Sequence, residues 1–71
     1  MRTGTIEMVV NGDPVAVPAG KTVQELLHFL GVRPDRVAVE VNRHVVHKRD
    51  WEHTPVETGA QVEIVEFVGG G

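Results

Sequence analysis

Cysteine is absent from this chain of 71 residues. Its absence excludes disulfides, thiolate metal ligands and a cysteine nucleophile, and it fits a protein that works in a reducing compartment. No apolar stretch approaches the roughly 20 residues that a membrane-spanning helix needs. Residues 1–5 do not open a signal-like apolar run. We therefore expect a cytoplasmic protein that has no membrane partner.

Positive charge is also scarce. Seven Lys and Arg residues stand against ten Asp and Glu residues, which gives a formal net charge of −3. The nearest approach to a basic cluster is Arg43, Lys48 and Arg49, which form no continuous block. Nucleic-acid affinity depends on a positive surface that displaces counterions from phosphates. We therefore expect no nucleic-acid partner.

Groups that could support a metal site or an active site are few. Glu63 and Glu66 differ in strand parity and should point to opposite faces of a strand. No Gly-rich loop followed by Lys and Ser or Thr is present to bind ATP. A domain of this size also buries only about 60% of its surface, which leaves little room for an active site. We therefore expect that the chain is not an enzyme and binds no cofactor. We also expect no metal site, because the three histidines of one loop-rich stretch lack the spacing of a metal-binding motif: His44, His47 and His53.

The aliphatic residues predict several strands and one helix. Valine occurs 15 times along the chain, whereas leucine occurs only at positions 26, 27 and 30. β-Branched residues favour strands, and leucine favours helices. Asn11-Gly12 is a strong signal for a two-residue hairpin turn, and Asn42-Arg43 is expected to turn the chain a second time. The expected strands cover residues 6–10, 15–17, 37–41, 45–46 and 62–68.

One helix is predicted over residues 22–30. Thr22 and Glu25 have the spacing of a capping box, in which each side chain accepts a hydrogen bond from the other residue's backbone N–H. Gly31 stands where a left-handed C-terminal cap is favoured. Apolar residues at i, i+3, i+4 and i+7 form a single stripe along this helix: Val23, Leu26, Leu27 and Leu30.

The order of elements is strand, strand, helix, strand, short strand, strand. One amphipathic helix on one face of a mixed sheet is a two-layer α+β architecture. This order is that of the β-grasp, or ubiquitin-like, fold, with four to five strands and one principal helix. We expect one such domain over residues 1–71, with Trp51 anchoring a long connection and with a flexible tail at residues 69–71.

The chain ends on Gly69, Gly70 and Gly71, directly after the last predicted strand. Glycines have no side chains to clash, so such a tail can enter a narrow channel in another protein. A free carboxylate does not accept sulfur, because oxide is a very poor leaving group. Adenylation by ATP would activate it, and a persulfide sulfur could then displace the adenylate. Since the chain has no ATP-binding motif, a partner must perform this activation.

The last predicted strand also contains a candidate docking patch. Val62 and Ile64 share one face of this strand and are expected in the core, whereas Val65 and Phe67 share the other. Exposed apolar residues beside the tail would form a contact surface for a partner. We predict that Val65 and Phe67, together with the neighbouring Val68, bind partner proteins.

Several segments along nearly the whole chain carry a family resemblance. A terminal diglycine alone is common among ubiquitin-like proteins, but here it combines with Trp51 and a short chain. In these features the chain resembles the ThiS family, the sulfur carriers of thiamin thiazole biosynthesis. The matching segments are the opening strand to Asn11-Gly12, residues 19–27, Val41-Asn42 with Val45-Val46, Trp51, and residues 62–71.

The resemblance implies a cycle of partner reactions around Gly71. A ThiF-like adenylyltransferase would adenylate its carboxylate with ATP and magnesium. A cysteine desulfurase or another persulfide donor would supply the sulfur. The resulting thiocarboxylate would pass sulfur to thiazole synthase, a ThiG-like enzyme. The chain itself would be a protein co-substrate that binds no cofactor, with Gly69 and Gly70 giving the tail access to the partner.

Three other functions remain open from the sequence. A MoaD-like sulfur carrier for molybdopterin synthesis would share the fold and the tail chemistry, although that family is usually longer and leads into its tail with proline. Phe67-Val68-Gly69 does not match that pattern. A ubiquitin-like protein modifier begins with the same acyl-adenylate. A β-grasp interaction module would leave the tail unused.

Overall fold

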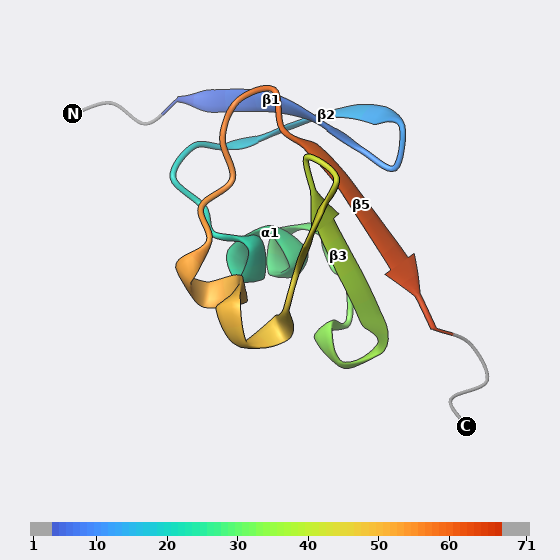
Figure 1. Ribbon diagram of the computed structural model, residues 1–71. Helices are drawn as coiled ribbons and strands as arrows, with labels where there is room; N and C mark the ends of the chain where they lie inside the picture. The colour runs from blue at the N-terminus through green and yellow to red at the C-terminus, as the bar shows by residue number, and fades with distance from the viewer. Residues whose placement is uncertain (1–3, 68–71) are drawn as a thin grey trace.

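The computed structural model describes residues 4–67, and within them five strands form one sheet (Figure 1). The strand order in space is β2-β1-β5-β3-β4. β1 and β5 run parallel, and the other neighbouring strands pair antiparallel, so the sheet is mixed as predicted. The strands are β1 Thr5–Val10, β2 Asp13–Pro18, β3 Val37–Val41, β4 His44–Val46 and β5 Gln61–Glu66.

Both predicted hairpin turns are confirmed. Asn11 and Gly12 join β1 to β2 with φ of 51° and 86°, and Asn42 and Arg43 join β3 to β4 with φ of 52° and 70°. Two successive residues at positive φ give the turn twist that matches the right-handed twist of the flanking strands. Pro14 lies in β2, an edge strand of the sheet. That is where a residue with no N–H to donate is tolerated.

The helix α1 spans Val23–Leu30 and packs against one face of the sheet (Figure 1). Thr22 is its N-cap, and the capping box with Glu25 is formed on both sides, with N···O distances of 2.9 and 3.3 Å. Gly31 ends the helix at φ 75°. The apolar stripe is the buried side, with Val23, Leu26 and Leu27 at most 1% exposed. Leu30, at the end of the stripe, is partly buried.

Trp51 anchors the connection between β4 and β5, as expected. This connection contains a 3-10 helix, Lys48–His53, and a second 3-10 helix, Pro34–Arg36, precedes β3. The Trp51 side chain is 2% exposed, and its Nε1–H donates to the Val46 carbonyl at 2.9 Å. A bulky aromatic with a satisfied N–H fixes a long segment against the core. The buried core consists of Met8, Val17, Val23, Leu26, Leu27, Val37, Val39, Trp51, Val56, Ala60 and Val62.

The last strand is shorter than the predicted range of residues 62–68. β5 ends at Glu66, which pairs with Val37, the first residue of β3. A 3-10 helix precedes Val37, so β5 has no further residue of β3 to pair with beyond Glu66. One further contact continues the ladder, because the Phe67 N–H donates to the Arg36 carbonyl at 2.8 Å.

Candidate functional site

β5 occupies the centre of the sheet and leads to the C-terminal tail. β1 lies on one side of it and β3 on the other, and Figure 1 shows its arrowhead directed towards the C-terminal end of the chain. Its pairing with β3 covers five residues of β5, from Val62 to Glu66, whereas its pairing with β1 covers only Gln61 and Val62. The C-terminal half of β5 therefore has a strand partner on one side only.

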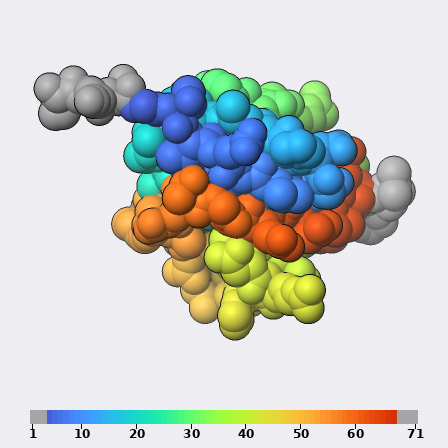
Figure 2. Space-filling view, turned by 90° about the horizontal axis from the view of Figure 1, so that it is seen from above, coloured from blue at the N-terminus to red at the C-terminus, as the bar shows by residue number. Residues whose placement is uncertain are grey.

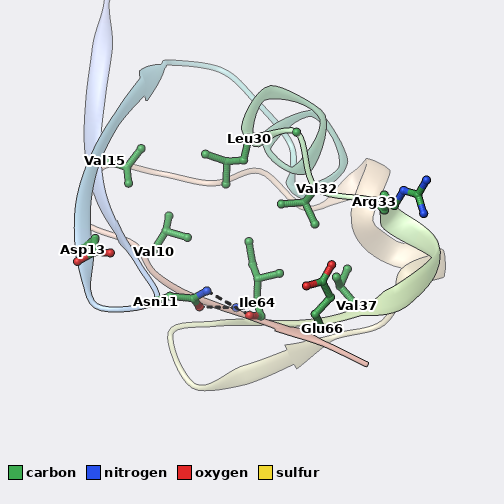
Figure 3. Close-up of a pocket in the computed structure, with 11 residues that line it drawn as sticks. Val10, Asn11, Asp13, Val15, Leu30, Val32, Arg33, Val37, Ile64 and Glu66 are labelled. Carbon is green, nitrogen blue, oxygen red and sulfur yellow. Dashed lines mark hydrogen bonds between the residues drawn. The ribbon is translucent and has the colours of Figure 1, made fainter. Parts of the chain in front are cut away.

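The side chain of Asn11 replaces the missing strand partner on the other side. Its Oδ1 accepts from the Ile64 N–H at 2.7 Å, and its Nδ2 donates to the Ile64 carbonyl at 3.2 Å (Figure 3). The amide thus makes the two bonds that a neighbouring peptide would make. Asn42 binds the beginning of the same strand, where its Oδ1 accepts from the Gln61 N–H at 2.9 Å. The two turn asparagines hold β5 at two points along its length.

Side chains alternate along β5 between the two faces of the sheet. Val62 is buried and Ile64 partly buried beneath the helix. Val65 and Phe67 are 57% and 54% exposed on the opposite face, which confirms the predicted alternation. Their predicted contact with a partner stays a prediction.

The face of the sheet away from α1, which we call the open face, extends beyond β5. Val45, in β4, is 60% exposed and pairs with Glu40 of β3, and Ala38 of the same strand pairs with Val65. Sequence reasoning missed Val45, because its place on this face depends on its pairing with Glu40. Val39 and Val41 face inward, so Glu40 and its cross-strand partner must face outward. In Figure 2 the blue residues of β1 and β2, the red residues of β5 and the yellow segment that contains β4 follow one another across the molecule.

A cavity of about 600 Å³ opens on the helix side of the sheet. Leu30, Val32 and Ile64 are among the aliphatic side chains that line it, and Figure 3 shows Asp13 and Glu66 at opposite sides. Sequence analysis did not anticipate this cavity. It lies across the sheet from Val65 and Phe67, so it does not belong to the open face.

Four predicted site residues lie outside the described residues. They are Val68 and the three glycines of the tail, Gly69, Gly70 and Gly71. The predicted adenylation and sulfur chemistry at Gly71 therefore remains a prediction, as does the access role of Gly69 and Gly70.

The histidines of the described region are exposed. His53 lies 3.2 Å from a Glu52 carboxylate oxygen, and the Nδ1 atom of His44 lies 3.0 Å from the Asn42 carbonyl oxygen. Across residues 4–67, no group of three or more His, Cys, Asp or Glu side chains is placed to hold a metal ion. No described helix combines the length and the apolar character needed to cross a membrane.

The mixed sheet, the single main helix and the central strand that leads to the terminus define a β-grasp protein. The crystal structure of a thiamine biosynthesis protein, ThiS, from Geobacter metallireducens matches this fold with a TM-score of 0.81 and 36% sequence identity. The match covers 93% of this chain and all of that one. The sequence model of the ThiS family matches residues 6–71. The chain belongs to the ThiS family.

Curated relatives include both free-standing and longer proteins. The sulfur carrier protein ThiS of Escherichia coli is 29% identical over 66 residues, a match that covers 93% of this chain and all of the relative. Thiazole synthases of Magnetococcus marinus and Paramagnetospirillum magneticum are 40% and 41% identical over 87% and 93% of this chain. The chain spans only about a fifth of the length of these two enzymes, 19% and 20%.

Proposed function

We propose that the chain carries sulfur as a C-terminal thiocarboxylate on Gly71 for thiazole formation in thiamin biosynthesis. The observation that carries this proposal is the ThiS family match, which runs to Gly71 and so includes the glycine terminus. The relative matched over its whole length is itself a sulfur carrier protein. The chain acts as a protein co-substrate in the cytoplasm, and its partner enzymes catalyse the reactions.

The proposed cycle begins with a ThiF-like adenylyltransferase. The Gly71 carboxylate attacks the α-phosphorus of magnesium-bound ATP, and pyrophosphate leaves. The terminal sulfur of a persulfide, supplied by a cysteine desulfurase or another donor, then attacks the acyl carbon and displaces AMP. A second thiol cleaves the resulting acyl disulfide, so the thiocarboxylate forms together with an ordinary disulfide.

The proposed acceptor enzyme is thiazole synthase. Two thiazole synthases contain a region similar to this chain, as about a fifth of their length. A domain that is fused to an enzyme in some proteins is a reasonable partner of that enzyme when the two are separate. This observation favours a thiazole over the pterin precursor that a MoaD-like carrier would serve.

Docking to these partners is assigned to Val65 and Phe67, with Val68 adjoining. The first two are more than half exposed on the open face, at the end of the strand that leads into the tail. Burial of exposed apolar area stabilises a complex, with about 25 cal/mol for each Å² removed from water. A partner bound at this position contacts the strand that precedes the tail in the sequence.

Intact-mass measurement tests the chemistry. The protein is incubated with the ThiF-like enzyme, ATP, magnesium, a persulfide source and a thiol. We expect a mass gain equal to the replacement of one oxygen by one sulfur, located by fragmentation at Gly71. The reaction without ATP is the control and should leave the mass unchanged. Sulfur found at any other position contradicts the proposal.

A further inference from the structure

The two edge strands of the sheet differ in length. β4 has three residues, His44–Val46, whereas β2 has six, Asp13–Pro18. An edge strand presents unpaired backbone N–H and C=O groups, which can pair with a strand of another molecule. A very short edge strand offers few of these groups. The β2 edge is therefore the one at which an added strand would find the more backbone partners.

Hydrogen bonds around β1 establish which residues of β2 face outward. The Val9 N–H donates to the Ala60 carbonyl at 2.9 Å, so the odd-numbered residues of β1 direct their backbone groups towards the β5 side. The even-numbered residues of β1 bond to β2, where the register makes odd-numbered residues their partners. The Ala19 N–H, which donates to the Gly4 carbonyl at 2.9 Å, continues this alternation beyond the strands.

The backbone groups of Pro14, Ala16 and Pro18 therefore point away from the sheet. Two of these three residues are prolines, which have no N–H to donate. Among the residues of β2, only Ala16 keeps a donor on the outer side, although all three carbonyls remain. Pro14 and Ala16 are exposed, and Pro18 is partly buried. The long edge of the sheet thus offers acceptors but almost no donors to an added strand.

The side chains of β2 would otherwise favour an added strand. Val15 faces the helix side of the sheet, where it is half-buried and lines the cavity with Leu30 and Val32 (Figure 3). The side chains of a strand added at this edge would lie beside Val15 and remove apolar area from water. Each copy of the protein carries the same edge, so a second copy is the strand donor that is always present.

We propose that Pro14 and Pro18 prevent this protein from pairing with a second copy of itself through β2. A symmetric antiparallel pair of β2 strands centred on Ala16 would place Pro14 of one copy opposite Pro18 of the other. Neither outer pair could form a hydrogen bond, because both of its residues lack an N–H. Only the central Ala16 pair would exchange its two bonds. This inference does not depend on the sulfur chemistry and goes beyond the proposed function.

Restoring the two donors tests the proposal. Pro14→Thr/Pro18→Thr returns an N–H to each position, and threonine is favoured in strands. In sedimentation equilibrium the wild-type mass should remain that of the monomer as concentration rises, whereas the mass of the double variant should increase towards twice that value. Pro34→Thr is the matched control, because it makes the same replacement in the 3-10 helix Pro34–Arg36, outside the sheet. It should remain a monomer.

A further substitution locates the contact in the double variant. The symmetric pair places Ala16 opposite its own counterpart, so Ala16→Lys in this background sets two like charges directly opposite each other. Lysine on an edge strand opposes pairing for the same reason. The triple variant should therefore return to the monomer. Association that persists in the triple variant, or that proceeds beyond the dimer, would show that another surface is responsible and would overturn the proposal.

Amide hydrogen exchange supplies a readout that the wild type itself provides. The Ala16 amide should exchange rapidly at every protein concentration, whereas the Val15 and Val17 amides, which bond to β1, should be protected. In the double variant the Ala16 amide should become protected as concentration rises. A protected Ala16 amide in the wild type, or a folded double variant that stays monomeric, would overturn the proposal.

Circular dichroism establishes that each variant is folded before its mass is compared. If the double variant does not fold, Pro14→Thr and Pro18→Thr are measured separately. Each single variant restores one outward N–H to every copy, so each should associate more than the wild type and less than the double variant. Two folded single variants that both remain as monomeric as the wild type would also contradict the proposal.

Discussion

The two faces of the sheet have different compositions and different roles. The face beneath α1 contains Met8, Val17, Val39 and Val62, each at most 1% exposed. The open face mixes exposed valine and phenylalanine with carboxylates. Both compositions come from the same strands, because successive side chains point to opposite faces. The buried residues that stabilise the fold therefore lie on one face. The residues proposed to contact partners lie on the other face and can be changed without altering the core.

The tail gives the largest expected effect and the sharpest test of this separation. Deleting Gly71 should abolish sulfur transfer, because the new carboxylate falls at most about 3.6 Å short of the reacting phosphate. Group transfer does not tolerate such a displacement from near-attack geometry. Thermal unfolding should barely change, since every core side chain is retained. The readouts are intact mass after the complete reaction and a thermal melt.

A Gly71-deleted protein that still supports thiamin-dependent growth would refute this reading. Gly70→Val supplies a second variant in which the carboxylate is retained. The added bulk and restricted backbone angles should block entry into the partner's channel. If Gly70→Val transferred sulfur at the normal rate, the access role of Gly70 would be wrong while the role of Gly71 remained.

Substitutions on the face covered by α1 should instead reduce the stability of the fold. Leu27 is 1% exposed between helix and sheet, so Leu27→Ala should reduce the free energy of unfolding by about 2–5 kcal/mol. Urea denaturation measures this loss. Gln24→Ala, on the exposed side of the same helix, should change stability little. A loss below about 1 kcal/mol for Leu27→Ala would mean that this face contributes less than its burial indicates.

Phe67 tests the open face through its apolar component. Phe67→Asp places a charge in the proposed contact, where it is desolvated and unpaired, so affinity for the ThiF-like enzyme should fall by about tenfold or more. Phe29 is a matched control, because it is 48% exposed on α1 and outside the open face. Phe29→Asp should leave the affinity unchanged. Similar losses in both variants would show that the effect is not specific to the open face.

Much of the fold could be predicted because its signals are local. The capping box of Thr22 and Glu25, the left-handed Gly31 and both asparagine turns depend on nearest neighbours in the chain. The alternation of β5 also revealed which of its valines face inward. The end of β5 was misplaced because it depends on where β3 begins, and no pattern within residues 62–68 encodes that pairing.

The open face of the sheet was less accessible to sequence reasoning. Glu40 and Glu63 are 23 positions apart in the chain, and their opposition depends on the register between β3 and β5. Val45 becomes part of the face only through its pairing with Glu40. The open face is therefore a property of strand order and register, whereas the alternation of side chains within one strand was enough to predict Val65 and Phe67.

The smallest expected effect concerns the two asparagines that hold β5. Asn11→Gly removes two hydrogen bonds to Ile64, and Asn42→Gly removes one to Gln61. Glycine suits both positions because their φ values are 51° and 52°. Replacing asparagine by glycine also increases the conformational entropy of the unfolded chain. This effect is similar in the two variants, so it largely cancels when their stabilities are compared. Each lost bond should cost about 0.5–1.5 kcal/mol.

Amide hydrogen exchange then separates the two positions, since the Ile64 amide should exchange faster in Asn11→Gly and stay protected in Asn42→Gly. Unchanged protection of Ile64 in Asn11→Gly would show that β3 alone holds the end of β5. Faster exchange would identify Asn11 as the group that secures the strand on its β1 side, close to the point where it leads into the tail.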